Sequence, residues 1–593
     1  MNNNIKIKLN ILLILFLSST LNSLLFSQII EEVEVKGKIY SNELNSKNIL
    51  IVSEKELNDL NIRNMVDLFS FFTIINVNKR GPSETSYDLT MRGSNFEQVL
   101  LLVNGVPINN PQTGHFNTDL PFSIKDIKRV EIVSGGNSTS YGAGAFAGVI
   151  NIILKRSSDF GFSVATGENN YLSSSINFGK RIKNIVFKFS FDKSNTSGFH
   201  EGRDLDQTKL STGIFYSNKN MEMDFYSGFL RKNFGAMCFY APLPSYEKIS
   251  SFFYQLSLKK RLKNFNYSLS YFCNFHNDYF ILDRDRPDYF NNESNTKINY
   301  LNLSFNYKMR KIESSSGFEI KKEIMDSASM GYHNRNKGSL FLNLSYPFKN
   351  GGIDAGIRGD FIFNGEKNFT FYSGIYHSFS SNLFFRVGCG KSFRLPSFTE
   401  LYYKSPANIG NGNLKPEISY NFETSISILK GTQNMDLSLF YRKQKNIIDW
   451  VKYSEEEIIW HAMNIDKNDI LGFGLSHRIN LDKTTIVYGI ERIYPINKQH
   501  KFKSKYELRF HDLNIKINLL QKITKNFKII SNYCYKRIYN TAHKGHFLNF
   551  SFGYSFQRFE LNLRFDNIFN TIIEEIPGVK IPGRWVYLGL VYR

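Results

Sequence analysis

Residues 109–117 form a short polar segment whose side chains could hold a solute. The segment reads Asn-Asn-Pro-Gln-Thr-Gly-His-Phe-Asn, so it combines amides, a hydroxyl and an imidazole with the turn-forming residues Pro111 and Gly114. These groups offer hydrogen-bond donors and acceptors to a ligand, and the alternative interpretation is a structural turn. The candidate ligand-binding residues of this segment are Asn109, Asn110, Gln112, Thr113 and His115.

Three aromatic residues elsewhere in the chain, Phe239, Tyr240 and Tyr403, could stack on a flat ring system. The alternative for each is an ordinary place in a wall of aromatic side chains. A metal-bearing ligand could also meet His115 or His461, although a lone histidine more often makes an ordinary hydrogen bond.

Two acidic clusters could hold Ca²⁺, because hard cations favour carboxylate oxygens. In the first cluster we expect Asp204 and Asp206 to be the calcium ligands. The second cluster, residues 283–288, interleaves Arg284 and Arg286 with its aspartates, so we expect solvated ion pairs there.

Chemical catalysis is not expected from this sequence. The eleven histidines belong to no recognisable nucleophile-and-base motif, and the four cysteines are widely separated, without the paired spacing of a metal site. We therefore expect no enzyme activity and no required cofactor, with Ca²⁺ in a loop as the one candidate ion.

The composition indicates a membrane barrel. Aromatic residues make up 15% of the chain, and the mean hydropathy of −0.30 excludes a helical membrane protein. The net charge of +21 is scattered along the chain and forms no block. It indicates attraction to the anionic head groups of outer-membrane lipid, and we expect no nucleic-acid partner.

Alternation of apolar and polar residues defines the larger part of the chain. In residues 185–192 the odd positions are apolar and the even positions mostly polar, and residues 265–271 and 301–307 repeat this pattern. At about twenty residues for each spanning strand and its connection, residues 160–593 provide about 22 antiparallel strands. We predict an all-β transmembrane barrel, and one this wide would leak unless an N-terminal α/β domain filled it.

The N-terminus predicts export. Lys6 and Lys8 precede the apolar run 11–17, and we expect residues 1–27 to be a secretory signal peptide. A membrane anchor is less favoured, because polar residues interrupt the run before it reaches spanning length. Next comes an alternating Glu/Val stretch in residues 28–40, a segment that could add itself as a strand to a partner's sheet edge.

Residues 41–156 are predicted to form a plug domain, followed by the barrel at 157–593. Residues 53–56 have the spacing of a capping box before a helical apolar pattern. Strand-like runs at 99–103, 130–133 and 149–154 would form a small sheet, the first of them ending at the turn pair Asn104-Gly105.

Segments spread over nearly the whole chain resemble the TonB-dependent outer-membrane receptors. The segments in question are Met91-Arg92-Gly93, Val99 to Val106, Val130 to Ile153, Ser392 to Tyr403, Gly412 to Glu417, Asp566 to Asn570 and Pro582 to Trp585. The resemblance implies energised uptake of a scarce, large solute across the outer membrane of a Gram-negative-type bacterium. It implies TonB as a partner, bound by Glu32, Val33, Glu34 and Val35. The presence of that segment and of the plug argues against a passive porin, and an adhesin would show no TonB-dependent uptake.

Within that family, four segments resemble the vitamin B12 (cobalamin) receptors of the Bacteroidetes type. They are residues 109–115, 233–240, 401–413 and 460–464. The leading ligand is therefore a corrinoid, with a ferric siderophore or haem as the alternative. A surface lipoprotein covering the barrel is a further candidate partner.

The resemblance also implies ion pairs that hold the plug in the barrel. Arg92 of the plug and Glu400 or Glu417 of the barrel match positions where the family places such pairs. Two departures stand out: residues 134–136 read Ser-Gly-Gly, where the family has Arg-Gly-Pro, and the chain ends in Tyr-Arg, where the family commonly ends in Phe. We therefore expect one basic plug-retaining residue to be absent.

Overall fold

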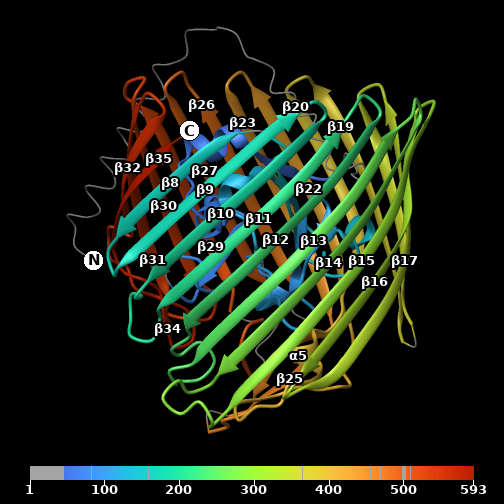
Figure 1. Ribbon diagram of the computed structural model, residues 1–593. Coiled ribbons are helices and arrows are strands. Elements are labelled where there is room, and N and C mark those ends of the chain that lie inside the picture. Colours follow the sequence, from blue (N-terminus) through green and yellow to red (C-terminus); the bar gives the residue numbers. More distant parts are fainter. Residues whose placement is uncertain are drawn as a thin grey trace. The chain divides into compact units, whose positions relative to one another are not determined.

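The computed structural model describes residues 46–592 except residues 82, 158, 364, 455, 466–468, 497–501 and 508. These residues belong to one compact unit, Lys38–Arg593, which contains a closed barrel and several smaller sheets (Figure 1). The predicted signal peptide and the predicted TonB-binding residues Glu32 to Val35 lie outside the described residues.

Twenty-two antiparallel strands form the barrel, as the length predicted. The ring closes where β8 (Phe160–Gly167) pairs with both β9 (Tyr171–Ile182) and the last strand, β35 (Trp585–Tyr592). The others are β10 (Ile185–Thr196), β11 (Leu205–Ser217), β12 (Met221–Gly235), β13 (Tyr246–Arg261), β14 (Phe265–Ile281), β15 (Asn291–Met309), β16 (Ile312–Ser327), β17 (Gly331–Phe348), β18 (Gly351–Ile362), β19 (Lys367–Ser380), β20 (Leu383–Arg394), β22 (Glu417–Lys430), β23 (Gln433–Lys445), β26 (Ile470–Asn480), β27 (Thr484–Pro495), β29 (His511–Lys522), β30 (Phe527–Ile538), β31 (Lys544–Phe556) and β32 (Phe559–Asp566).

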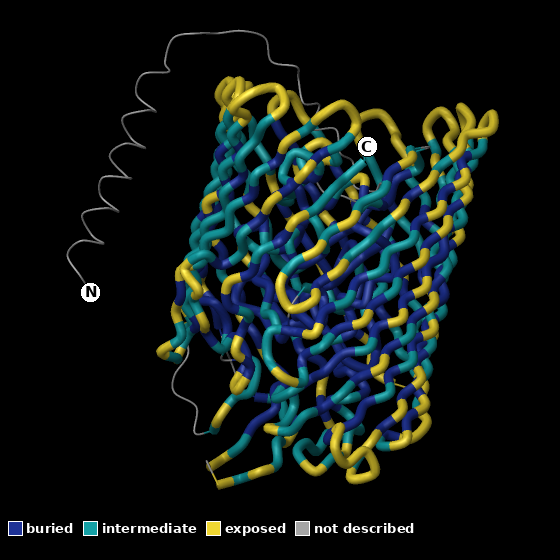
Figure 2. Tube along the Cα trace, turned by 60° about the vertical axis from the view of Figure 1, so that its left-hand side comes forward, coloured by how far each residue is buried: buried dark blue, intermediate teal, exposed yellow. Residues whose placement is uncertain are grey.

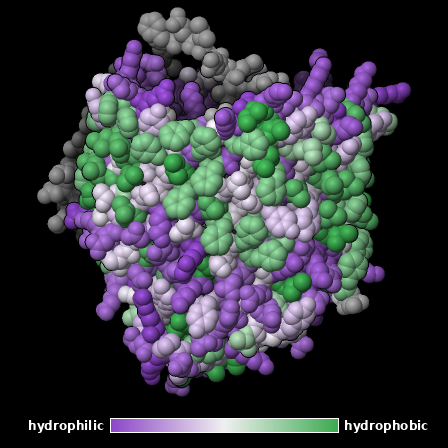
Figure 3. Space-filling model, viewed as in Figure 1, coloured by the Kyte–Doolittle hydropathy of each residue, from purple (hydrophilic) through white to green (hydrophobic). Residues whose placement is uncertain are grey.

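The predicted alternation of side chains is confirmed in the wall. On β10, Phe187 and Phe189 are 40% and 42% exposed, whereas Lys188 and Ser190 between them are buried. Apolar side chains cover much of the outer face, and buried residues fill the interior (Figures 2 and 3). Among the described residues, no helix combines the length and the apolar composition needed to cross a membrane.

The two ends of the barrel differ in their connections. At one end the strands are joined by short turns, such as residues 349–350 between β17 and β18. At the other, which we call the loop end, longer segments carry α5 (Phe398–Tyr402) and the strands β21 (Asn408–Ile409), β24 (Ile447–Lys452), β25 (Trp460–Ile465), β28 (Lys503–Ser504), β33 (Glu574–Ile576) and β34 (Val579–Lys580) (Figure 1). Three of the loops join into a four-stranded sheet, β21-β25-β24-β28, and this brings together the predicted segments 401–413 and 460–464.

The N-terminal domain is mixed α/β, as predicted. Ser53 caps α2 (Glu54–Asp59) through the predicted capping box with Glu56, and α3 (Met65–Phe71) follows. Asn104 and Gly105 both have positive φ, the conformation that their tight turn requires. The main sheet has the strand order β1 (Ile49–Ser53), β6 (Ile127–Ser134), β7 (Gly148–Leu154), β4 (Val99–Val103), β5 (Val106–Pro107). A second sheet pairs β2 (Ile75–Lys79) with β3 (Tyr87–Met91). The remaining elements are α4 (Ser138–Tyr141) and the 3₁₀ turns η1 (Phe96–Gln98), η2 (Gly114–Phe116) and η3 (Ile124–Asp126).

Buried ion pairs join this plug domain to the inner wall of the barrel on three consecutive strands. The carboxylate of Asp126 lies 2.9 Å from the ammonium of Lys188 on β10. Glu84 lies 2.7 Å from Lys209 on β11, and Asp119 pairs with Lys232 on β12. Each pair consists of a plug acid and a barrel lysine that are both buried, so the opposite charges compensate one another's removal from water.

Arg92 makes the predicted kind of contact with a different partner. Its guanidinium donates two hydrogen bonds to Glu423 on β22, at 2.9 and 2.8 Å, and its carbonyl accepts one from Arg442. The predicted partners Glu400 and Glu417 instead flank Arg394, so the predicted pairing of Arg92 with either of them is wrong. We call the Arg92–Glu423 pair the latch. Its partner could not be read from sequence spacing, because it depends on how the plug is rotated within the barrel.

Glu417 nevertheless contacts the plug, because it accepts a hydrogen bond of 3.0 Å from the Gln98 amide. The departure at residues 134–136 also has a structural reason. A Cβ on Gly136 would lie 2.2 Å from the Asn421 amide nitrogen and 2.5 Å from the Ser392 hydroxyl. The plug backbone therefore passes too close to the wall for a larger residue without rearrangement.

Arg92→Ala is expected to loosen the plug. The substitution leaves the Glu423 carboxylate without its cation. Because the Glu423 side chain is 21% exposed, the loss should be smaller than the roughly 3 kcal/mol that breaking a fully buried pair costs. Entry of large antibiotics into cells that express the variant should rise, measured as a lower inhibitory concentration. Arg181→Ala, at an exposed arginine of β9, is the matched control; antibiotic entry through the Arg92 variant equal to that of this control would contradict the latch.

Candidate functional site

Four rings meet where the plug faces the loop end. His115, on η2, stacks on Phe96 with ring centroids 4.0 Å apart and an interplanar angle of 26°. Tyr506 presents its edge to both rings, at 5.8 and 5.1 Å, and Tyr240 approaches His115 at 6.4 Å. We call these four side chains the aromatic cradle. Two of its members come from the plug, and two come from different loops of the barrel.

A buried ion pair supports the cradle from the plug side. Arg80 and Asp88 lie 2.6 Å apart, and His115 Nδ1 lies 2.8 Å from the Asp88 carboxylate. Burial and, after it, the positive charge of Arg80 lower the pKa of His115 to about 4. Burial alone would raise the pKa of Asp88, but Arg80 and His115 hold it below its ordinary value. At neutral pH the four side chains of the cradle are therefore uncharged, and the opposite charges of Arg80 and Asp88 next to His115 compensate one another.

Several of the predicted binding residues use their side chains within the plug. The Asn109 amide accepts a hydrogen bond from Leu101 N–H and donates one to the Val99 carbonyl, at 2.8 and 2.9 Å. Thr113 caps η2, and its hydroxyl also donates to Glu97. Asn109 and Thr113 thus shape the segment, which is the structural turn that the sequence left open.

Asn110 and Gln112 retain unused hydrogen-bonding atoms. Gln112 Nε2 donates to the Asp278 carboxylate on β14 at 3.1 Å. Gln112 Oε1, Asp278 Oδ1 and Asn110 Nδ2 are buried, and within the described part of the chain they have no hydrogen-bond partner. Unpaired buried polar atoms are costly, so these three atoms mark places where a ligand's polar groups would gain most.

The predicted aromatic residues separate into three environments. Tyr240 lies in the cradle, with Phe280 at 5.3 Å behind it. Phe239 is buried in an apolar cluster with Phe116 and Phe234, where it serves as wall. Tyr403 packs against Leu414 and its neighbours in the loop-end sheet, and His461 is an exposed residue of β25.

The predicted calcium ligands are held by cations. Asp204 lies 2.9 Å from Arg284, and Asp206 pairs with Lys193. Across the residues that the structure describes, no group of three or more His, Cys, Asp or Glu side chains is placed to hold a metal ion. In the second acidic cluster the expected ion pair is confirmed, because Asp283 lies 2.8 Å from Arg286.

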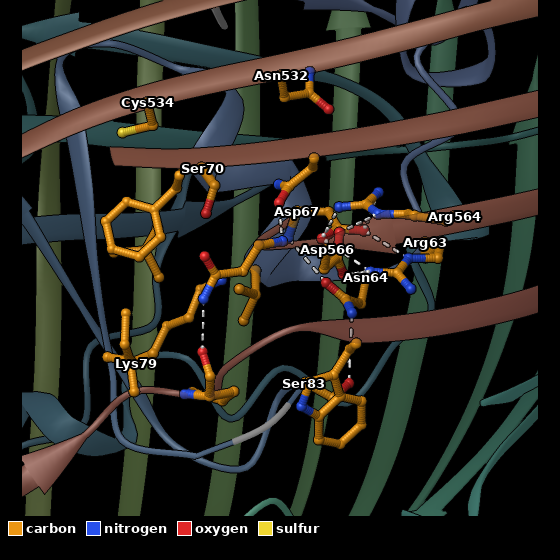
Figure 4. Close-up of a pocket in the computed structure, with 18 of the residues that line it drawn as sticks. Arg63, Asn64, Asp67, Ser70, Lys79, Ser83, Asn532, Cys534, Arg564 and Asp566 are labelled. Carbon is orange, nitrogen blue, oxygen red and sulfur yellow. Dashed lines mark hydrogen bonds and ion pairs between the residues drawn. The ribbon is translucent and has the colours of Figure 1, made fainter. Parts of the chain in front are cut away.

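A cavity of about 170 Å³ lies at the seam between α3 and the strands β29 to β32. Figure 4 shows Arg63 and Asp67 of the plug pointing toward Arg564 and Asp566 of β32. Arg63 pairs with Asp566 at 2.9 Å, and Arg564 pairs with Asp67 at 3.0 Å. This balanced network joins plug and wall, and we assign the cavity to the seam between them.

Phe96 and Tyr506 are not among the binding residues predicted from the sequence. Phe96 directly precedes Glu97, whose carboxylate accepts a hydrogen bond of 2.8 Å from Gly114 N–H and thereby orients η2. Tyr506 lies in a loop whose position is fixed when Lys505 N–H donates to the Trp450 carbonyl at 3.0 Å. That contact joins two separate loops, so no local sequence pattern predicts it.

Comparison with known families gives two matches that together span most of the chain. Residues 42–149 match the TonB-dependent receptor plug domain, and residues 134–570 match the TonB-dependent receptor-like β-barrel. Two curated relatives are named vitamin B12 transporters. The one from Vibrio vulnificus (strain CMCP6) is 24% identical over 70% of each chain, and the one from Photobacterium profundum is 23% identical over 72% of each.

Solved structures share the fold. The siderophore receptor PirA from Acinetobacter baumannii superposes with a TM-score of 0.76 at 14% identity, covering 92% of this chain and 98% of that one. A ferric enterobactin receptor (PfeA) mutant from Pseudomonas aeruginosa gives a TM-score of 0.75 at 13% identity, with the same coverage.

His115 should make the plug apex sensitive to acid. Because the pKa of His115 is about 4 in the folded protein and about 6.5 in an unfolded chain, the unfolded state binds more protons between these values. Stability contributed by neutral His115 is therefore present above pH 6.5 and is lost as the pH falls toward 4. Protection factors of residues 110–117, which are exchange rates corrected for the intrinsic rate at each pH, should fall over this range, and His115→Gln should show a smaller fall. Identical pH profiles in the two proteins would contradict this assignment.

Proposed function

This chain belongs to the TonB-dependent receptors of the outer membrane, and we propose that the solute it imports is a corrinoid of the vitamin B12 type. Members of this family are transporters that depend on TonB, and the short turns of such barrels face the periplasm while the longer loops face the cell exterior. The aromatic cradle is thus on the side from which a solute arrives.

The observation that carries the proposal is the neutral aromatic cradle with unpaired polar atoms beside it. A corrinoid presents a flat macrocycle with amide groups at its rim. The rings of Tyr240 and Tyr506 offer apolar faces and edges to such a macrocycle, and the buried ring of Phe96 supports His115 by stacking on it. Gln112 Oε1 could accept a hydrogen bond from a ligand amide, and Asn110 Nδ2 could donate one.

The names of the curated relatives support the same ligand. Both relatives described above are called vitamin B12 transporters, at identities of 24% and 23%. The siderophore receptors among the solved structures share the fold at 13–14% identity, which leaves an iron chelate as the alternative that the binding experiment must test.

Energy for transport would enter through the N-terminal segment. We infer that Glu32, Val33, Glu34 and Val35 pair as a strand with TonB, because alternating residues ahead of the plug can extend a partner's open sheet edge.

Binding of cyanocobalamin to the detergent-purified receptor tests the proposal, with ferric siderophores and haem measured beside it. We expect selective cobalamin binding, weakened about tenfold in Tyr240→Ala and in Tyr506→Ala because each loses one ring of the cradle, at about 1.4 kcal/mol.

Tyr332→Ala is the matched control. This tyrosine of β17 is 62% exposed at the same end of the barrel. Saturable binding of an iron chelate without cobalamin binding would identify the iron chelate, and not a corrinoid, as the transported solute. Cobalamin affinity that fell equally in all three variants would remove the cradle from the binding site.

A further inference from the structure

A second cavity, of about 100 Å³, lies between the plug and the strands β16, β17 and β18. Its plug side is formed by Glu97, Leu100, Pro107 and residues 109–111 and 141–144, and its barrel side carries Lys321, Arg335 and Lys337. Residues 109–111 also begin the segment that carries Gln112 and His115. The cavity and the aromatic cradle therefore adjoin the same plug segment.

Three cations share one carboxylate on the barrel side. Lys321, Arg335 and Lys337 lie 2.9, 2.7 and 2.7 Å from the carboxylate oxygens of Glu323. Lys321 and Lys337 are also directly opposite each other on β16 and β17, a like-charge arrangement that destabilises a strand pair. All four side chains are at least 85% buried, so solvent screens this excess of positive charge poorly.

The other cations of the cavity wall have more than enough negative charge. Arg358 is paired with Glu319 and Asp360, and Arg394 is paired with Glu400 and Glu417. The positive excess is thus confined to the face formed by β16 and β17.

Unpaired atoms of the same cavity are donors. Asn110 and Arg394 line it and are 6% and 3% exposed, and Asn110 Nδ2 and Arg394 Nε have no hydrogen-bond partner within the described ranges. Among the described lining residues, no buried side-chain acceptor is left without a partner. The face formed by β16 and β17, with its local excess of positive charge, and the unused donors of the same cavity are complementary to an anion.

We propose that this cavity is an anion site in which Lys321, Arg335 and Lys337 receive a phosphate or carboxylate group of the transported solute. The inference rests on the proposed function for the identity of that solute. A solute held over the aromatic cradle would reach the cavity with an anionic arm passing residues 109–111, because the cavity is too small for a macrocycle. The cations would fix the orientation of the solute against the plug.

Inorganic phosphate is the first probe, because it tests the site whatever the solute is. Broadening of the ³¹P resonance on addition of the purified receptor should show saturable binding in the wild type. Binding should weaken at least tenfold in the double variant Lys321→Gln/Lys337→Gln and should persist in Lys337→Arg, which keeps the charge. The matched control is Lys322→Gln, at the adjacent position of β16. Phosphate binding that is absent from the wild type, or equal in the double variant and the control, would overturn the site.

The second arm separates the two sources of the anion. Cyanocobalamin carries a phosphodiester, and cobinamide is a corrinoid that lacks it. If the corrinoid phosphate occupies the site, the double variant should bind cyanocobalamin at least tenfold more weakly and cobinamide unchanged. If the wild type binds no corrinoid, the proposed function fails. In that case, weaker binding of ferric citrate by the double variant than by the wild type would assign the site to a carboxylate. If the double variant binds every ligand with the same affinity as the Lys322→Gln control, the inference is overturned.

Discussion

Opposite charges buried between the plug and the barrel wall are the constraint on which this structure depends. A wall of 22 strands that alternates apolar and polar side chains must present polar groups inward wherever it presents apolar groups to lipid. Filling that lumen with a folded domain would leave charges buried without water. The lysines at 188, 209 and 232 meet this requirement, because each faces a plug carboxylate.

The same constraint positions the candidate binding site. The cradle joins His115 and Phe96 of the plug to Tyr240 and Tyr506 of the barrel loops, so its geometry exists only while the plug is in place. Release of the plug contacts by an external pull would therefore disturb the cradle as well as the seam. In the proposed function, binding outside and energy input inside would therefore be coupled through the contacts between plug and barrel.

Local features of the fold could be predicted from the sequence, and contacts between distant segments could not. The alternation around Phe187 and Lys188 has a period of two, and the Ser53–Glu56 capping box spans four residues, so each is visible in a short window. The partner of Arg92 depends on the rotation of the plug, which places Glu423 beside it, whereas the family resemblance implied Glu400 or Glu417. Likewise, the sequence predicts a polar segment at 109–117, but it does not show that the Asn109 side chain hydrogen-bonds the backbone of Leu101 and Val99.

Ionic conductance of the intact receptor in a planar lipid bilayer tests the central claim most directly. If buried charge pairs hold a folded plug across the lumen, the reconstituted protein should pass no steady current at moderate voltage. It should open reversibly to a wide channel only when urea is added at a concentration that unfolds the plug and leaves the barrel intact. A large steady conductance in the absence of urea would contradict the account, because it would mean that the plug does not close the barrel.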